Sequence, residues 1–184
     1  MKLNCPSDMD KLEIARRRIS TVMAKTMDLY GTPPSIGMLY ATLYFSEDPL
    51  TLDELKESMG MSKTSMSTGV RKLEENHFVN KVWQKGVRKD LYEAQKDFYE
   101  SFIGFYCNMW HRELELNMEA IRKAEPELKA LLKSSDEEVR RLAERDLAQL
   151  ENGQNYYKWL EKLVKSLESG KIFDFIPKLE KEVD

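Results

Sequence analysis

The sequence predicts a mainly α-helical protein with one small pair of strands, divided into two domains at residues 1–96 and 97–184. Three observations predict this fold class. Apolar residues recur at helical spacing through most of the chain, residues 79–94 alternate apolar and polar side chains as strands do, and the pattern is helical again from residue 97 onward. A chain of this length can bury a sizeable core.

Charge is distributed unevenly along the chain. The whole sequence has a net charge of only −3, but the segment Met61–Lys89 holds seven basic and two acidic residues. That segment therefore has a net charge of +5 and leaves −8 for the remainder. Such asymmetry indicates a local surface for a negatively charged partner, which the net charge of the whole chain conceals.

Cysteine usage and hydropathy indicate a cytoplasmic protein. Cys5 and Cys107 form no CxxC pair, so we expect neither a disulfide framework nor a zinc knuckle. No stretch approaches the roughly 18 apolar residues that a membrane span requires, and the arginine run at residues 16–18 excludes an apolar signal core. We interpret this arginine run as the solvated side of a helix rather than as a phosphate contact.

The N-terminal part predicts two helices. The first covers residues 7–30 and ends at Gly31 and the Pro33-Pro34 pair. The positions expected to face its core are Leu12, Ala15, Ile19, Val22 or Met23, Thr26 and Leu29. The second helix covers residues 35–45 and stops before Asp48-Pro49. Its broad apolar face consists of Ile36, Leu39, Tyr40, Leu43 and Tyr44.

Two short helices joined by a tight turn follow. Thr51 and Glu54 have the spacing of a capping box, which starts the first of them. Gly60 supplies the turn, and Ser62 can cap the second short helix. The apolar side chains of this second helix recur at i, i+4 and i+7 and are expected to be buried: Met66, Val70 and Leu73.

The opposite face of the second short helix carries short hydroxyl side chains and lysines, which are mediocre helix formers or strongly charged. Short hydroxyls at a helix N-terminus let the backbone come close to a phosphate or to the edge of a base. The composition of this face therefore indicates a binding surface. Gly69 is expected to let the preceding helix pack closely.

The period then changes from helical to alternating. Residues 79–84 and 90–94 are predicted to form two strands joined by a basic loop that contains Gly86. A helix, a tight turn, a second helix and a hairpin with a basic tip make up a winged helix-turn-helix. The sequence thus predicts a winged helix-turn-helix DNA-binding domain with a two-stranded wing.

The C-terminal part predicts a helical dimerisation region. We expect one helix over residues 97–125, a short helix that Pro126 opens, and a long helix from a Ser135/Glu138 capping box to about Glu168. The long helix would be a rod of about 50 Å with one apolar stripe. Because so long a rod has little core of its own, we expect it to pack against a second copy of the chain.

Three stretches together resemble a known family. They are the upstream segment GTPPSIGMLYATLYF (31–45), the run ELxxxMGMSKxxxSxxxRxLExxxxV that begins at Glu54, and the wing GVRKDxYEA that begins at Gly86. They resemble the winged helix-turn-helix of MarR-type (multiple-antibiotic-resistance-type) transcriptional regulators, and most closely the choline- and glycine-betaine-responsive, GbsR-like repressors. The resemblance is strong over residues 31–94 and loose after residue 97.

The resemblance implies a homodimer that represses osmoprotectant (glycine betaine/choline) uptake or synthesis genes by binding double-stranded operator DNA, with choline or glycine betaine as effector. Two alternatives remain open. The winged helix could be a protein-interaction scaffold that binds no DNA, or the chain could be a DNA-binding repressor without a small-molecule effector. Binding to DNA would exclude the interaction scaffold. Release from DNA on addition of a ligand would exclude a repressor without an effector.

The residues expected to contact DNA lie on the second short helix and on the wing. These residues could simply form a solvated surface. However, the charge, the helix-turn-helix spacing and the wing all favour contact with DNA. On the helix the candidates are Lys63, Thr64, Ser65, Ser67, Thr68 and Arg71. On the wing they are Lys85, Arg88 and Lys89.

Neither a metal site nor catalysis is expected. His111 and Glu115 lie at i and i+4, but this is a weak metal signal without a third ligand. No Ser-His-Asp or Cys-His arrangement has recognisable local context, and no phosphate-binding glycine loop is present. We therefore expect that the protein is not an enzyme and has no cofactor.

Aromatic residues gather at the start of the C-terminal part, between residues 98 and 110. One stripe, with Phe98, Phe102 and Phe105, is expected to be ordinary core. A second stripe contains tyrosine and tryptophan, whose electron-rich rings can hold a quaternary ammonium group. The cage candidates, placed where this helix faces the helix over residues 35–45, are Tyr40, Tyr44, Tyr99, Tyr106 and Trp110.

Overall fold

The computed structural model describes residues 7–179 and divides the chain after Gly104 into an N-terminal unit, Met1–Gly104, and a C-terminal unit, Phe105–Asp184. The division falls inside helix α5 (Phe98–Leu131), whereas the sequence analysis placed the domain boundary before that helix. Within residues 7–179, no helix is both long and apolar enough to cross a membrane.

The N-terminal unit begins with two packed helices, α1 (Asp8–Leu29) and α2 (Pro34–Tyr44). A capping box between Ser7 and Asp10 starts α1. The helices approach so closely that a Cβ on Gly37 would lie 2.6 Å from the Cα of Ala24.

The predicted inward face of α1 is wrong except at Met23, which packs against the core. The structure buries Ser20, Ala24 and Met27, because these side chains allow α2 to approach. The predicted stripe lies on a neighbouring face, and its large members are exposed: Leu12, Ile19, Val22 and Leu29.

A small sheet and two short helices complete the N-terminal fold. The order is β1 (Leu50–Thr51), α3 (Leu52–Met59), α4 (Lys63–Glu75), β2 (Val79–Val82) and β3 (Leu91–Ala94). The three strands are antiparallel in the order β1-β3-β2, with β1 pairing Leu50 to Tyr92. The two-residue strand β1 was not predicted, because two residues carry no alternation. The winged helix-turn-helix itself is confirmed.

One hydrophobic core joins these elements. It is drawn from α1, α2, α3, α4 and the strands β2 and β3. Leu39, Leu55 and Met66 are among its fully buried side chains. This core fixes α4 and the β2–β3 hairpin relative to each other. The face of α4 that points away from the core therefore has a rigid support.

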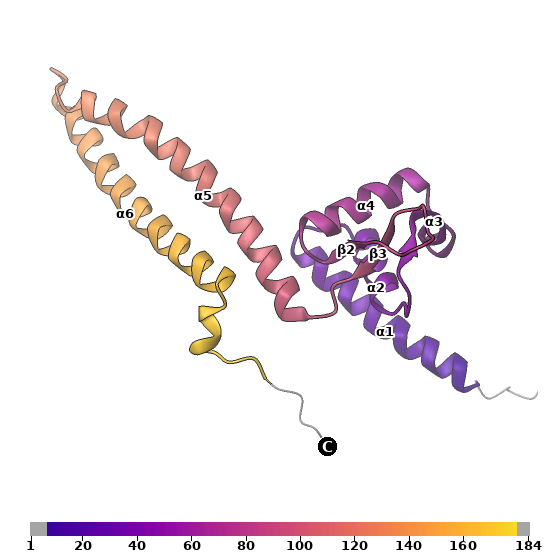
Figure 1. The fold of residues 1–184 in the computed structure, drawn as a ribbon. Helices are drawn as coiled ribbons and strands as arrows, with labels where there is room; N and C mark the ends of the chain where they lie inside the picture. Colours follow the sequence, from indigo (N-terminus) through magenta and orange to yellow (C-terminus); the bar gives the residue numbers. More distant parts are fainter. Residues whose placement is uncertain (1–6, 180–184) are drawn as a thin grey trace, which may run out of the picture. The chain divides into compact units, whose positions relative to one another are not determined.

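The C-terminal unit is a hairpin of two long helices, α5 (Phe98–Leu131) and α6 (Glu137–Glu168), which run side by side (Figure 1). Contacts join them along the seam: Gln154 Nε2 donates to Glu125 Oε2 at 3.1 Å, and His111 Nε2 lies 2.7 Å from Glu168 Oε1. The α6 stripe therefore packs first against α5 of its own chain, which corrects the expectation of a rod without a core.

Two predicted boundaries of the hairpin are also wrong. Pro126 does not open a new helix but lies inside α5. The missing N–H costs about 3 kcal/mol in a helix interior, yet α5 continues through this point, where Gln154 of α6 donates to the preceding Glu125. At the start of α6, the N-cap is Asp136 rather than Ser135, and its Oδ1 accepts from the N–H groups of Glu138 and Val139.

Candidate nucleic-acid interface

Helix α4 is set up by the turn and cap that its sequence predicts. Gly60 adopts the left-handed conformation, with φ of 63°, and ends α3. Ser62 Oγ then accepts from the backbone N–H of Ser65 at 3.1 Å and caps α4. The hydroxyl of Ser65 lies 2.9 Å from that of Ser62, so Ser65 is turned back toward the cap.

The two faces of α4 are divided as predicted. Met66, Val70 and Leu73 are buried, whereas the six candidate DNA contacts from Lys63 to Arg71 are all exposed. Gly69 is buried, and a Cβ there would lie 2.8 Å from Leu39 Cδ2. The helix that Gly69 accommodates is therefore α2 and not the preceding helix α3.

The wing is the hairpin of β2 and β3 with the loop between them. Its three candidate cations, Lys85, Arg88 and Lys89, are exposed. Lys89 is ion-paired with Asp53 of α3 at 2.8 Å, and Lys81 with Asp90 inside the wing at 2.9 Å. Within the part of the chain that the structure describes, no ion pair is found for Lys85 or Arg88. These two cations are the ones most available to phosphate.

The sequence analysis missed two residues of this surface. Trp83 follows β2 and is 82% exposed, although it is one of the largest apolar side chains in the protein. Asp53 pairs with Lys63 as well as with Lys89, both at 2.8 Å. An apolar residue inside a basic segment was the available signal for Trp83. No sequence pattern places Asp53 beside two lysines that are distant along the chain.

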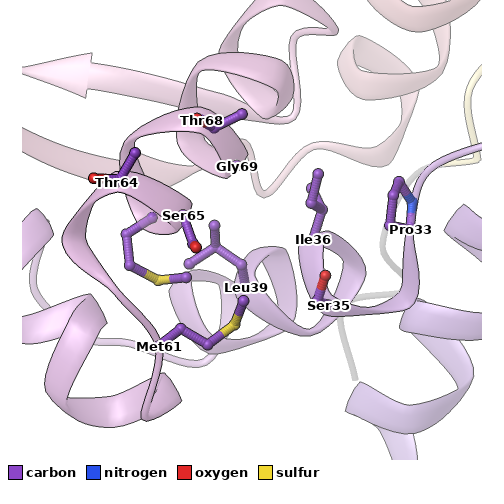
Figure 2. A pocket seen from close by; sticks show the side chains of 10 residues that line it. Pro33, Ser35, Ile36, Leu39, Met61, Thr64, Ser65, Thr68 and Gly69 are labelled. Carbon is purple, nitrogen blue, oxygen red and sulfur yellow. The ribbon is translucent and has the colours of Figure 1, made fainter.

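A hollow of about 330 Å³ lies beside α4 (Figure 2). Its apolar lining includes Ile36 and Leu39 of α2, while Thr64 and Thr68 of α4 contribute hydroxyls. None of its lining residues is charged or carries a tyrosine or tryptophan ring. This hollow therefore differs in chemistry from the predicted cage, and any group that filled it would lie against the exposed face of α4.

The predicted cage residues fall into two groups. Tyr40, Tyr44 and Tyr99 belong to the N-terminal unit, and Tyr106 and Trp110 to the C-terminal unit. Tyr106 and Trp110 form a pair with ring centroids 5.3 Å apart and planes tilted by 40°. Tyr44 is half-buried, and its ring centroid lies 6.0 Å from that of Tyr40.

Tyr40 has the environment of a core residue. It is only 3% exposed, and its hydroxyl donates to the carbonyl oxygen of Gln95 at 3.1 Å. Burial raises the pKa of Tyr40 to about 12, so the phenol stays protonated. Its ring meets Phe78 edge-on at 5.4 Å. A ligand could reach Tyr40 only through its neighbours.

Residues 7–179 contain no group of three side chains suited to hold a metal ion. His111 is bonded to Glu168 instead. Cys107 is buried, and burial raises the pKa of its thiol to about 11, which keeps it from acting as a nucleophile. The exposed surface of α4 and the wing is the arrangement in the described part of the chain that matches a known kind of binding site.

Comparison with protein families and with known sequences gives three findings. Residues 98–174 match the model of the C-terminal helical hairpin of GbsR family transcriptional regulators. The HTH-type transcriptional repressor GbsR of Bacillus subtilis (strain 168) is 42% identical over 168 residues, which are 90% of this chain and 93% of that protein. The HTH-type transcriptional repressor OpcR of the same organism is 34% identical over 176 residues, 92% and 93% of the two chains.

Among solved structures, the crystal structure of a transcriptional regulator has a TM-score of 0.53, with 14% identity over 82% of this chain and 99% of that chain. At such low identity the likeness concerns the fold alone. It agrees with the winged helix-turn-helix described above.

Proposed function

Because this chain belongs to the GbsR family of transcriptional regulators, we propose that it represses genes for osmoprotectant uptake or synthesis by binding operator DNA. The observation that carries the proposal is the exposed polar face of α4 beside a basic wing. The family consists of transcriptional regulators, so the chain is not an enzyme, as its sequence predicted.

The proposed DNA contacts divide by chemistry. Thr64, Ser67 and Thr68 lie in the first two turns of α4, where the side chains of a recognition helix reach base edges in the major groove. Their short hydroxyls allow a close approach and can donate to or accept from a base. Lys85 and Arg88 of the wing supply positive charge to the phosphate backbone, where each contact releases condensed counterions.

We also propose a homodimer, and exposed apolar surface supports it. Leu12, Ile19 and Val22 of α1 are between 44% and 61% exposed and lie on one stripe. Contiguous apolar side chains left in water are unfavourable and are typical of an interface. A two-fold dimer would bury them. Two copies would place two α4 helices in successive major grooves, about 34 to 36 Å apart, so the operator should be an inverted repeat.

The proposed effector is choline or a related quaternary ammonium ion. A tyrosine or tryptophan ring attracts such a cation to its face, and Tyr106 and Trp110 already form a ring pair on α5. Helix α5 begins in the N-terminal unit and continues into the C-terminal unit. A ligand bound to its aromatic residues would act on the segment that joins the units, and it would shift the equilibrium toward the arrangement that it binds more tightly.

The first experiment measures DNA binding and its response to ligand together. The DNA upstream of the chain's own gene is titrated in a gel shift with and without choline. A complex whose affinity changes with choline supports both proposals. A complex that choline does not alter supports a repressor without an effector. No complex with this DNA under any condition would favour a protein-interaction scaffold.

The second experiment locates the cation. Titration calorimetry with choline compares wild type with Tyr106→Ala and Trp110→Ala, and with Trp159→Ala as a matched control from the aromatic pair Tyr156 and Trp159 on α6. Losing a cage ring should weaken choline binding several-fold to about thirtyfold, because each cation-π contact contributes about 0.5 to 2 kcal/mol. Unchanged choline affinity in both α5 variants, with the fold intact, would move the site elsewhere.

A further inference from the structure

One carboxylate connects three elements of the DNA-binding unit. Asp53 lies in the first turn of α3, Lys63 is the first residue of α4, and Lys89 lies in the loop of the wing. Asp53 Oδ1 is 2.8 Å from the ammonium nitrogen of Lys63, and Asp53 Oδ2 is 2.8 Å from that of Lys89. Each oxygen therefore holds a different lysine, and both lysines are candidate DNA contacts.

The charges in this cluster support each other. The hydrogen bond from Lys63, followed by that from Lys89, lowers the pKa of Asp53 to about 2. The bond to Asp53 raises the pKa of Lys89, and the nearby charges of Glu54 and Glu57 act in the same direction. The first turn of a helix also favours a carboxylate. Asp53 and Lys89 are therefore both charged at neutral pH.

Stability alone does not account for this cluster. More than half of each lysine side chain is exposed, at 58% for Lys63 and 65% for Lys89. Ion pairs this exposed contribute little to the free energy of unfolding. What they do is restrict two long, flexible side chains to one place. They also attach the wing loop to the N-terminus of α4.

We propose that Asp53 determines the specificity of DNA binding by withholding Lys63 and Lys89 from sequence-independent contacts with phosphate. This inference rests on the proposed DNA-binding function. A free lysine reaches phosphates on any duplex, so two free lysines at this surface would raise affinity for all sequences alike. Held by Asp53, they keep the wing at a fixed spacing from α4, which favours the operator that fits both elements.

Other cations of the same surface differ in this respect. Lys81 pairs with Asp90, but both belong to the wing and its loop, so this bond connects nothing to α4. Lys85 and Arg88 have no ion pair within the described residues and remain available to the phosphate backbone of DNA. On this surface, Asp53 thus holds Lys63 and Lys89, whereas Lys85 and Arg88 can contact phosphate.

The test compares Asp53→Asn with wild type on two duplexes of equal length, the DNA upstream of the chain's own gene and a scrambled sequence, across a series of salt concentrations. The asparagine keeps the shape and removes the charge. The expected result is roughly tenfold tighter binding to the scrambled duplex, with a salt slope up to about 1.8 steeper because two phosphate contacts are gained. Affinity for the upstream DNA should rise less, so the ratio of the two affinities falls.

Two controls make the test specific. Glu138→Gln removes a surface ion pair with Arg141 in the hairpin and changes the net charge equally, so it should alter neither slope nor ratio. In a Lys63→Gln/Lys89→Gln background, Asp53→Asn should have no further effect on the scrambled duplex. If it strengthens that binding by the same factor as before, it acts through net charge and the proposal is overturned.

Other outcomes are equally decisive. A folded Asp53→Asn protein with the wild-type ratio and slope overturns the proposal and leaves the proposed DNA-binding function intact. Equal loss of affinity for both duplexes overturns it as well, because Asp53 would then only support the fold. A wild-type chain that binds neither duplex would contradict the proposed function itself.

Discussion

The two units of the chain are built differently. In the N-terminal unit, α1, α2, α3, α4 and the strands β2 and β3 contribute to one core. In the C-terminal unit, the buried side chains of α6 lie along the α5 seam, and aromatic residues such as Tyr156 and Trp159 stay exposed. The comparison teaches that α4 and the wing are held by the core of their own unit, whereas apolar surface that a second copy of the chain can bury is exposed on the hairpin and on α1. The predictions below test this difference.

The largest effect is expected where two helices of the N-terminal unit meet backbone to backbone. Gly37→Ala would place a Cβ 2.6 Å from the backbone Cα of Ala24, and the backbone cannot yield as a side chain can. We expect the free energy of unfolding to fall by about 3 kcal/mol. Gly153→Ala on α6 is the matched control, because nothing lies within 4 Å of its Cβ. It should gain up to about 1 kcal/mol from helix propensity. Thermal unfolding of both variants checks this, and equal losses would contradict the comparison.

The next effect concerns the exposed apolar surface of the hairpin. If a second copy buries it, a hundredfold rise in protein concentration should stabilise the hairpin by up to about 2.7 kcal/mol. In a Trp83→Phe background, the remaining fluorescence comes from Trp110 and Trp159, which both lie in this unit, and unfolding followed by it should shift to higher temperature. Light scattering provides the independent measurement of mass. A concentration-independent transition and a monomeric mass would remove the dimer from the account.

A smaller effect separates the two units by their tryptophans. The sequence contains three, of which Trp83 lies on the wing and the other two in the hairpin. DNA on the wing should change the emission of Trp83, which is 82% exposed. Choline should instead change that of Trp110. We expect Trp83→Phe to remove the response to DNA and to keep the response to choline. Loss of both responses, or of neither, would show that the two sites are not separate.

The smallest effect is the pH dependence of the Asp53 cluster. The pKa of Asp53 is about 2 in the folded protein, below its ordinary value of 3.8. A lowered pKa contributes stability that is fully present above the unfolded value and is lost as pH falls through about 2. The difference in unfolding free energy between wild type and Asp53→Asn should therefore be constant near neutral pH and shrink below pH 4. A difference that persists unchanged at pH 2 would contradict this assignment.

Local patterns predicted the parts of the fold that depend on local chemistry. The cap at Ser62, the turn at Gly60 and the buried triad of α4 follow from residue types and spacing, and all three are confirmed. The prediction for Pro126 was wrong because contacts of α5 with α6 leave no trace in a local pattern. The prediction for the N-cap of α6 was wrong because spacing does not tell which of two adjacent polar side chains reaches the free N–H groups.

Long-range packing was beyond a single sequence. The stripe on α1 satisfied helical periodicity, yet the face that packs is the one with Ser20, Ala24 and Met27, because the close approach of α2 at Ala24 decides it. The ion pairs of Asp53 join residues from three elements, and no spacing encodes them. The roles of the candidate DNA-contacting and cage residues stay predictions, because exposure and ring geometry do not identify what they bind.

The central claim is that the N-terminal unit binds DNA through α4 and the wing. Its most direct test is the salt dependence of affinity for the upstream DNA in a Lys85→Ala/Arg88→Ala variant. A Lys123→Ala/Lys129→Ala variant, which removes the same charge from α5 of the hairpin, is the matched control. The account predicts that the slope of log affinity against log salt flattens by about 1.8 in the wing variant only, since each phosphate contact contributes about 0.9. Equal slopes in the two variants would contradict it.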